Sequence, residues 1–323
     1  MRIFLTGGAG YIGSICAEHL LDRGHEVTVF DNLSEGHRSA VDPRAVFVEG
    51  DLNDRGATLS AVRDADPGAV MHFAANALVA ESMRDPSKYF RNNVGGGINL
   101  ADAAVAAGVG VFIFSSTCAT YGVPERIPMD ESLPQRPINP YGESKLMFER
   151  ILDWYGRIHG LRHVNLRYFN AAGASEKYGE HHRIETHLIP NILKVALGQD
   201  PHVEVYGTGH PTPDGTCIRD FIHIIDLAQA HELALDAKAC ASYNIGTGSG
   251  YSVKQIIDVA RQVTGHPIPI VERPARPGDP PRLMASAEKL RRELGWRPKF
   301  ESIEAIVASA WHWHRAHPEG YKD

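Results

Sequence analysis

The sequence predicts an α/β fold with a doubly wound parallel sheet, followed by a smaller C-terminal α/β domain. The first half of the chain alternates short apolar runs with longer helical segments, and a glycine-rich turn follows the first run. After about Asn170, Pro, Gly and His become frequent and the elements become shorter. We therefore expect one domain over residues 1–170 and another over 171–323, with the chain free to cross between the lobes.

Five runs of five residues predict strands, because they are apolar with little alternation, as in strands buried on both faces. They cover residues 2–6, 26–30, 45–49, 69–73 and 110–114. Between them, we expect helices over 11–23, 54–64 and 86–107. A longer helix should begin near Asn139-Pro140, since Pro suits a first turn, and end near Gly160, a C-cap residue. Residues 161–169 then predict another strand.

Composition limits the classes of function that fit this chain. With 323 residues, 43% hydrophobic and 22% charged, the composition is that of a globular protein rather than a disordered one. No apolar run approaches the roughly 20 residues that span a bilayer. The net charge of −6 argues against general binding of nucleic acids or acidic membranes. The four cysteines lack zinc-ligand spacing, so we expect reduced thiols, a cytoplasmic protein and no metal site.

Gly7, Gly10 and Gly13 form a Gly-x-x-Gly-x-x-Gly turn between the first strand and the first helix. Glycines let the backbone approach a pyrophosphate, and the helix N-terminus adds N–H groups and the positive end of its dipole. Asp31 ends the second strand, where a carboxylate accepts hydrogen bonds from ribose hydroxyls and repels a 2′-phosphate. The pattern therefore predicts a Rossmann-type domain that binds NAD rather than NADP.

Two further stretches follow strands at the same edge of the predicted sheet. Asp51-Leu52 comes just after the third strand and is placed to bracket an adenine. Phe73-Ala74-Ala75 comes at the end of the fourth strand and offers small residues where a dinucleotide crosses the sheet edge. Local packing alone would explain either stretch equally well.

Tyr141 and Lys145 form a Tyr-x-x-x-Lys pair, and residues four apart lie on one face of a helix. A free tyrosine has a pKa of about 10, and a nearby ammonium and the positive charge of a nicotinamide would both favour the phenolate. Tyr141 is therefore a candidate proton acceptor. Ser115 and Thr117 follow the fifth strand, where a hydroxyl can hydrogen-bond a reacting oxygen, although a turn or N-cap also favours these residues.

Seven stretches, spread over nearly the whole chain, carry a family resemblance. They are TGGAGYIGS (6–14), FDNLS (30–34), FSST (114–117) with Tyr121-Gly122, YGESK (141–145), RYFNAAG (167–173), DGTCIRDFIH (214–223) and RPGD (276–279). Together they resemble the extended short-chain dehydrogenase/reductase family, and within it the members that epimerise UDP-hexoses. The C-terminal stretches are the specific ones, because many relatives share the N-terminal ones.

The resemblance implies tightly held NAD and epimerisation at C4 of a UDP-hexose through a transient 4-keto sugar. It places the cofactor against Tyr11, Ile12, Asp31, Asn32, Asp51, Leu52, Phe73, Ala74, Ala75, Asn92, Ser115, Lys145 and Phe169. It places the UDP-sugar against Thr117, Asn170, His187, Leu188, Tyr206, Arg219, Arg276, Asp279 and Leu283. The arginines make physical sense, because a net-acidic protein needs local guanidinium groups to bind a diphosphate.

Related functions stay open at this point. A 4-epimerase of UDP-uronic acids or UDP-N-acetylhexosamines fits the same residues, and a non-catalytic NAD-binding sensor would share the fold without needing Tyr141 and Lys145 together. A 4,6-dehydratase needs an acid/base pair after the hydroxyl residue, which Cys118 and Ala119 cannot supply. The resemblance also implies a homodimer formed through two helices, including 92–107 and 141–159. It gives Leu283 a position beside the C2 substituent of the sugar, with partial room for an acetamide.

Overall fold

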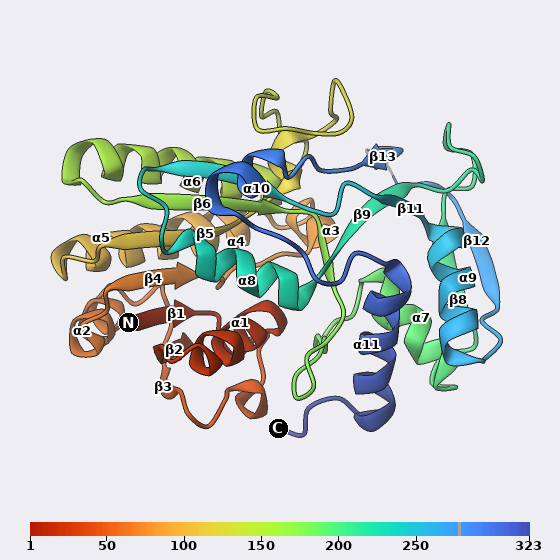
Figure 1. The fold of residues 1–323 in the computed structure, drawn as a ribbon, viewed down its shortest axis with the longest axis horizontal. Coiled ribbons are helices and arrows are strands. Elements are labelled where there is room, and N and C mark those ends of the chain that lie inside the picture. Colours follow the sequence, from red (N-terminus) through yellow and green to blue (C-terminus); the bar gives the residue numbers. More distant parts are fainter. Residues whose placement is uncertain (277–278) are drawn as a thin grey trace.

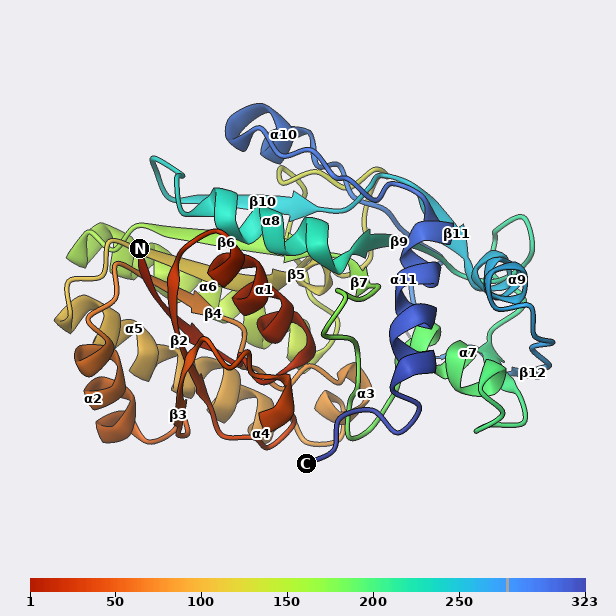
Figure 2. The ribbon, with the colours of Figure 1, turned by 60° about the horizontal axis from the view of Figure 1, so that its bottom comes forward.

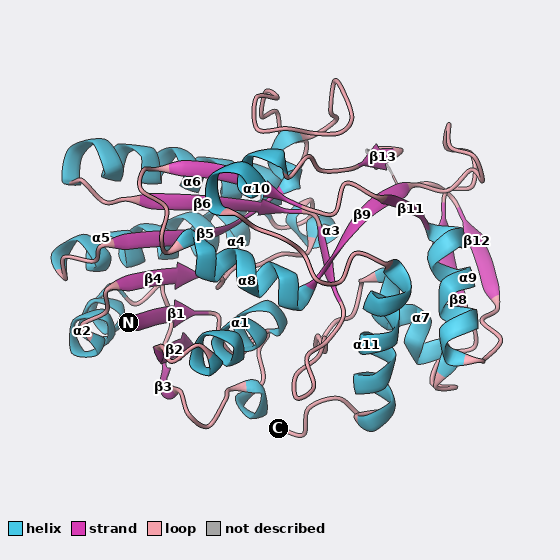
Figure 3. Ribbon diagram, viewed as in Figure 1, coloured by secondary structure: helices cyan, strands magenta, loops and turns pink. Residues whose placement is uncertain are grey.

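The structure is a computed structural model that describes residues 1–276 and 279–323 (Figure 1). Pro277 and Gly278, the middle residues of the RPGD stretch, lie outside the described residues. One large parallel sheet with flanking helices makes up most of the first half of the chain. A smaller part with short strands and three longer helices lies beside the carboxyl edge of that sheet (Figures 1 and 3).

Seven parallel strands form the large sheet, in the order β10-β6-β5-β4-β1-β2-β3. They are β1 (Arg2–Thr6), β2 (Glu26–Asp31), β3 (Val46–Glu49), β4 (Ala69–His72), β5 (Val111–Thr117), β6 (His163–Tyr168) and β10 (Ala241–Ile245). The order turns back at β1, which pairs with β2 on one side and β4 on the other. Carboxyl ends at such a point form the crevice in which open α/β sheets bind ligands. The predicted doubly wound parallel sheet is thus confirmed.

Helices cover both faces of this sheet, which explains why its strands are apolar on both sides (Figure 2). Ile3 and Leu5 of β1 pack into a core with α1 (Tyr11–Asp22) and α8 (Ile224–Ala234). Phe4, between them in sequence, packs into a second core on the opposite face. The helices of that face are α2 (Arg55–Ala65), α5 (Gly97–Ala106) and α6 (Pro140–His159). Because β10 and α8 come from beyond residue 170, the chain crosses back to the large sheet after it has left it.

The segment 86–107 differs from the single helix that the sequence predicts. It consists of α4 (Pro86–Tyr89), a π-helical stretch η2 (Phe90–Gly96) and then α5. A Cβ on Gly97 would lie 2.6 Å from the Phe148 ring, so glycine is required where this helix meets α6. Within the π-helical stretch, the buried Asn93 donates hydrogen bonds to Asn76 O and Ser144 Oγ, both at 3.0 Å. Tertiary packing on α6 therefore reshapes a segment whose local pattern is helical.

The smaller part is built around two short sheets. In one, β9 (Ile218–His223) pairs with β7 (Asn170–Ala172), β11 (Gly250–Ser252) and β13 (Arg282–Leu283); in the other, β8 (Val203–Tyr206) pairs with β12 (Ile270–Arg273). The helices α7 (Leu188–Ala196), α9 (Val253–Thr264) and α11 (Ile303–Ala316) enclose a separate hydrophobic core. The remaining short helices are η1 (Arg38–Ala40), α3 (Val79–Ser82), η3 (Cys118–Tyr121) and α10 (Glu288–Leu294).

Candidate functional site

The glycine turn between β1 and α1 is made of backbone approaches too close for side chains. Gly7 has a φ of +75°, and a Cβ there would lie 2.5 Å from the backbone nitrogen of Ala74. A Cβ on Gly13 would lie 2.1 Å from the carbonyl oxygen of Gly7. Gly10 is the N-cap of α1, and its N–H donates to Gly7 O at 3.2 Å. The turn therefore presents the N-terminus of α1 at the sheet edge, the arrangement that binds a pyrophosphate.

Tyr11 and Ile12 follow this turn, and their side chains contact protein. The Tyr11 hydroxyl donates to the carbonyl of Gly173 at 2.7 Å, which ties α1 to the chain just after β7. The side chain of Ile12 packs against the core that α1 and α8 share. Any contact of these two residues with a pyrophosphate would therefore involve their backbone.

The predicted ribose and adenine residues meet along the ends of β2 and β3. Asp31 is buried, and its carboxylate accepts hydrogen bonds from Ala9 N at 3.0 Å and Leu33 N at 2.8 Å. Burial raises the pKa of Asp31, and these two backbone hydrogen bonds lower it in part. Asn32 donates to Asp51 at 3.0 Å. The carboxylate that the sequence assigns to a ribose is thus also the group that joins the glycine turn to β2.

Leu52 and Asn92 lie on the same side of this edge. Leu52 is buried, and its carbonyl accepts a hydrogen bond from Asn99 of α5 at 2.8 Å. The carbonyl of the Asn92 side chain accepts from Asn53 at 3.5 Å, which connects the π-helical stretch to the chain after β3. Both residues therefore border the region where Asn32 and Asp51 meet.

Residues 73–75 follow β4 directly beside the glycine turn. The N–H groups of Phe73 and Ala74 both donate to Thr6 O, at 3.0 and 3.2 Å, which holds the end of β4 against the end of β1. The Phe73 ring lies 4.7 Å from the ring of His231 on α8. Ala75 continues along the same edge in the loop after β4.

Thr117, Tyr141 and Lys145 come together where β5 ends against α6. The helix begins at Pro140, as predicted, because the Asn139 side chain accepts a hydrogen bond from Gly142 N at 2.8 Å. The Tyr141 phenol lies near the side chain of Thr117, which lowers the pKa of that phenol in part. Lys145 is 3% exposed, and its Nζ donates to the carbonyl of Ser115 at 2.8 Å. A hydroxyl, a phenol and an ammonium thus occupy the carboxyl end of β5.

Burial dominates the electrostatics of this group. It raises the pKa of Tyr141 to about 12, while the side chain of Thr117 acts in the opposite direction. Burial lowers the pKa of Lys145 to about 7, and the negative charge of Glu149 raises it in part. The protein alone therefore favours the neutral phenol, and an added positive charge is needed to make the phenolate accessible at neutral pH.

A buried polar network lies behind these three residues, and the sequence analysis assigned it no role. Arg167 of β6 forms a forked ion pair with Glu149 of α6, with contacts of 2.6 to 3.2 Å. Glu149 also accepts from Ser116, and Arg167 donates to the Tyr121 hydroxyl at 2.9 Å. Side-chain exposures of 7% for Arg167 and 4% for Glu149 make the pair almost dry. The signal in the sequence that could have indicated this pair is Glu149, which lies one helical turn beyond Lys145 on the same helix face.

Four predicted substrate residues gather in the smaller part, three of them on β7, β9 and β13 and Asp279 in the chain before β13. Asn170 donates to Asp220 O at 2.8 Å, which fixes β7 beside β9. Arg219 of β9 pairs with the carboxylate of Asp279. Leu283 stands opposite Arg219 in the register of β13 with β9.

Leu283 also lies near the end of β5, where Thr117 is. It packs against a small cluster that contains Phe169, Tyr121 and Met129, with Cys118 beside it. Cys118 follows Thr117 directly, so the predicted sugar residue, the predicted nicotinamide residue and the end of β5 share one cluster. The structure thereby brings together groups that are up to 165 residues apart, from Cys118 to Leu283.

The remaining predicted substrate residues form two separate groups. The guanidinium of Arg276 lies 4.1 Å from the centre of the Tyr206 ring, at the ends of β8 and β12. Leu188 begins α7 and packs into the core of the smaller part. His187 is the N-cap residue of α7, and its Nδ1 lies 3.1 Å from Glu180 and 3.0 Å from Glu185. In this structure the His187 ring is therefore engaged by carboxylates.

Two further features bear on the predicted setting. In the part of the chain that the structure describes, no helix is both long and apolar enough to cross a membrane. Cys16, Cys118, Cys217 and Cys240 are all free. Burial raises the pKa of Cys118 to about 12, so this thiol, beside Thr117, is not an acid or base at neutral pH.

Known proteins resemble this chain over essentially its full length. The model of the NAD dependent epimerase/dehydratase family matches residues 3–246. UDP-glucose 4-epimerase of Streptococcus mutans is 50% identical, covering 100% of this chain and 99% of that protein. Among solved structures, UDP-glucose 4-epimerase from Brucella ovis in complex with NAD has a TM-score of 0.93 and 46% identity, covering 96% of this chain and 97% of its own. UDP-glucose 4-epimerase from Bifidobacterium longum in complex with NAD+ and UDP has a TM-score of 0.95 and 36% identity, covering 99% and 100%.

Proposed function

This chain belongs to the NAD dependent epimerase/dehydratase family, and we propose that it interconverts UDP-glucose and UDP-galactose by epimerisation at C4. The observation that carries the proposal is the meeting of Thr117, Tyr141 and Lys145 at the carboxyl end of β5. Relatives of the same length that bear the name of this activity support it.

The residues at the sheet edge fit an NAD molecule. The cradle that Gly7 and Gly13 leave open would hold the pyrophosphate, and Asp31 would accept hydrogen bonds from the adenosine ribose. Lys145, with a buried ammonium beside the end of β5, would hold the nicotinamide ribose, and Phe169 would pack near the ring. Bound NAD would supply reversible hydride transfer at C4 of the sugar, so the reaction would have no net oxidation.

Tyr141 would move the proton in this scheme. Its phenolate takes the proton of the sugar 4-hydroxyl as that carbon is oxidised, and its phenol gives the proton back when the 4-keto sugar is reduced. Thr117, close to Tyr141, would hydrogen-bond the same sugar oxygen. The ammonium of Lys145, one helical turn away, favours the phenolate by its charge. In this scheme, Thr117, Tyr141 and Lys145 would stay in position while the proton leaves the sugar oxygen and later returns to it.

Inversion at C4 requires the 4-keto sugar to present its other face while its UDP stays bound. Asn170, Arg219 and Arg276 would supply this anchor, because guanidinium groups match the geometry of a diphosphate. Leu188 and Tyr206 would surround the uracil and its ribose, at the start of α7 and the end of β8. The His187 ring, which the resemblance places there too, contacts Glu180 and Glu185 instead. We assign different roles to the two predicted domains. Residues 171–323 would supply most of the UDP-sugar contacts, and residues 1–170 would supply the cofactor contacts and the catalytic groups.

The direct test uses the purified full-length chain with UDP-galactose and no added cofactor. We expect UDP-glucose to form until equilibrium is reached, with no accumulation of reduced cofactor. Parallel reactions with a UDP-uronic acid and with UDP-N-acetylglucosamine separate the related 4-epimerase activities. A protein that binds NAD but converts none of these substrates would be a sensor, and the proposal would be wrong.

We also propose that the chain forms a homodimer through α5 and α6. Met147, Trp154 and Ile158 lie on one face of α6, and they are 37%, 58% and 67% exposed. A cluster of large apolar side chains on one exposed helix face is typical of an interface. Sedimentation should give twice the chain mass for the parent, and the variant Trp154→Glu should shift the protein towards monomer. A parent that sediments as a monomer would contradict this part of the proposal.

A cytoplasmic location completes the proposal. All four cysteines are free, including the exposed Cys240, and unpaired thiols persist in reducing compartments. Immunodetection after cell fractionation is the measurement, with recovery in the cytoplasmic fraction as the expected result.

A further inference from the structure

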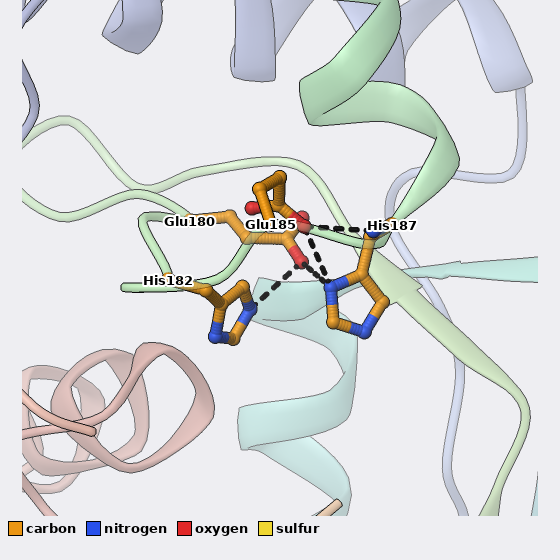
Figure 4. Close-up of side chains that lie close together, drawn as sticks. All are labelled: Glu180, His182, Glu185 and His187. Atoms are coloured by element: carbon orange, nitrogen blue, oxygen red, sulfur yellow. Dashed lines mark hydrogen bonds and ion pairs between the residues drawn. The ribbon is translucent and has the colours of Figure 1, made fainter. Parts of the chain in front are cut away.

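Four side chains in the loop before α7 form a compact cluster of two carboxylates and two imidazoles. Glu180, His182, Glu185 and His187 each offer one ligand atom, and these atoms lie within 4.8 Å of one another (Figure 4). The four residues follow a Glu-x-His-x-x-Glu-x-His spacing, which matches neither helix nor strand periodicity. Only the folded loop therefore brings them together. The prediction of no metal site rested on the spacing of the cysteines and did not consider these four residues.

The separations within the cluster are close to those around a metal ion. His187 Nδ1 lies 3.1 Å from Glu180 Oε1 and 3.0 Å from Glu185 Oε1, and His182 Nε2 lies 3.1 Å from Glu180 Oε1. A tetrahedral zinc ion with bonds of roughly 2.0–2.1 Å holds its ligand atoms about 3.3 Å apart. Three of the separations are thus already close to this value, and the remaining ones, which are at most 4.8 Å, would shorten when an ion binds.

The charges of the cluster also favour a cation. The side chains of Glu180 and Glu185 are 6% and 3% exposed, and burial of ionised carboxylates is costly unless their charge is compensated. Among the described residues, the ion-pair partners of these two carboxylates are His182 and His187. Within the same residues, neither carboxylate is paired with a lysine or an arginine. One divalent cation with two neutral imidazoles would balance both negative charges.

We propose that Glu180, His182, Glu185 and His187 bind a divalent transition metal ion, with zinc as the best match. Imidazole and carboxylate together suit zinc and its neighbours in the first transition row, whereas calcium and magnesium prefer oxygen ligands alone. His182 and His187 are 29% and 49% exposed in their side chains, so the ion can enter from solvent. The site lies outside the group of Thr117, Tyr141 and Lys145, so its role is structural.

The position of the cluster indicates what the ion would stabilise. The His182 ring lies 6.3 Å from the ring of Tyr11, the residue that begins α1 after the glycine turn. Arg183, between two of the ligands, donates to the carbonyls of Leu33 and Gly36 in the loop after β2. His187 is the N-cap residue of α7. A bound ion would therefore fix the connection between the cofactor side and α7, which begins the smaller part.

The experiment uses the full-length, tag-free chain with NAD bound, first treated with a chelator and then transferred to metal-free buffer. Titration calorimetry with Zn2+ and the thermal midpoint with and without Zn2+ are the two readouts. We expect about one ion per chain and a higher midpoint in its presence, because an ion that binds the native state stabilises it. In His182→Gln and Glu180→Gln, we expect at least a ~10-fold weaker affinity and no rise in midpoint.

The matched control is His312→Gln, which removes an exposed histidine of α11 far from the cluster in sequence. This variant should bind Zn2+ like the parent and show the same rise in midpoint. If Glu180→Gln fails to fold, the part-exposed His182 alone carries the test. No stoichiometric binding by the parent, unchanged affinity in His182→Gln, or an equal loss in His312→Gln would each overturn the proposal.

Discussion

The cofactor side and the sugar-nucleotide side of the candidate site are built in different ways. On the cofactor side, the groups that would do the chemistry stand on a seven-stranded parallel sheet and a 20-residue helix, and Lys145 is 3% exposed. On the sugar-nucleotide side, the residues stand on strands of two to six residues, on loops and at the start of α7, and Arg219 and Asp279 retain 14% and 27% exposure of their side chains. The chemistry is thus fixed in the rigid core, while recognition depends on short elements that can vary.

Because the chemical groups lie in the rigid core, we expect the largest loss of activity when one of their reacting atoms is removed. Tyr141→Phe removes only the phenolic oxygen, and we expect turnover to fall by about 10²–10⁴, the usual contribution of general acid–base catalysis. NAD should stay bound, because the cofactor contacts lie elsewhere. Measured kcat for UDP-galactose, with cofactor content from absorbance of the denatured supernatant, checks both statements. Tyr155→Phe, on the same helix and outside the site, is the control, and a kcat for Tyr141→Phe within threefold of the parent would remove Tyr141 from its proposed role.

The second prediction concerns the buried pair behind the catalytic groups. Glu149→Gln leaves the buried guanidinium of Arg167 uncompensated, so we expect the free energy of unfolding to fall by about 3–5 kcal/mol. Glu125→Gln, which breaks the exposed pair with Arg136, should change it by less than about 1 kcal/mol. Equal effects of the two substitutions would contradict the contrast between a rigid core and a tolerant surface.

The same variant makes a prediction about pH. Burial lowers the pKa of Lys145 to about 7, and the charge of Glu149 raises it in part. Removal of that charge lowers the pKa further, so the ammonium is lost at a lower pH. The alkaline side of the kcat profile should therefore move to lower pH in Glu149→Gln and stay in place in Glu125→Gln. An unmoved alkaline side in Glu149→Gln would limit Glu149 to a structural role.

The cofactor side was also the side that the sequence predicted best. The glycine turn, Asp31 at the end of β2 and the bounds of α6 all follow from local rules of turns and caps. Asn139 and Gly160 delimit α6 as expected, with Gly160 in the left-handed region at a φ of +71°.

Features that depend on contacts between distant segments could not be read from spacing. The π-helical stretch Phe90–Gly96 arises where the following helix packs on α6, and β10 joins the large sheet by pairing with β6. The Glu149–Arg167 pair joins residues 18 positions apart on different elements. On the sugar-nucleotide side, Arg219 and Asp279 lie 60 positions apart, and only the family resemblance pointed to them.

The fourth prediction tests how the cofactor side selects its ligand. Asp31→Ala removes the carboxylate that would repel a 2′-phosphate, so the preference for NAD over NADP should fall by roughly 10-fold or more, as expected for loss of hydrogen bonds to a charged group. Asp31→Asn, which keeps an acceptor for Ala9, separates the loss of charge from the loss of the turn contact. Dissociation constants for both cofactors are the measurement, and an unchanged ratio in both variants would place Asp31 away from the ribose.

The smallest expected effect lies on the sugar-nucleotide side, at Leu283. This residue sits opposite Arg219 and packs beside Phe169 and Cys118, so it borders the place where we propose the sugar to lie. Leucine is shorter than tyrosine and lacks its ring and hydroxyl, which leaves partial room for an acetamide at C2. We therefore expect UDP-N-acetylglucosamine to be epimerised detectably, with a lower kcat/KM than UDP-glucose.

Leu283→Tyr should close this space without touching the chemistry. A misfit of one or two heavy atoms changes discrimination by about 1–3 kcal/mol, and a two-residue strand at a sheet edge favours the lower end of that range. We expect kcat/KM for UDP-N-acetylglucosamine to fall about 10-fold, with that for UDP-glucose within about twofold of the parent. Leu283→Met, of similar volume, should keep the parent ratio. If the parent shows no activity on the N-acetyl substrate, or the tyrosine variant keeps the ratio, Leu283 does not set this selectivity. Another residue on the sugar-nucleotide side would then have to set the selectivity for the substituent at C2.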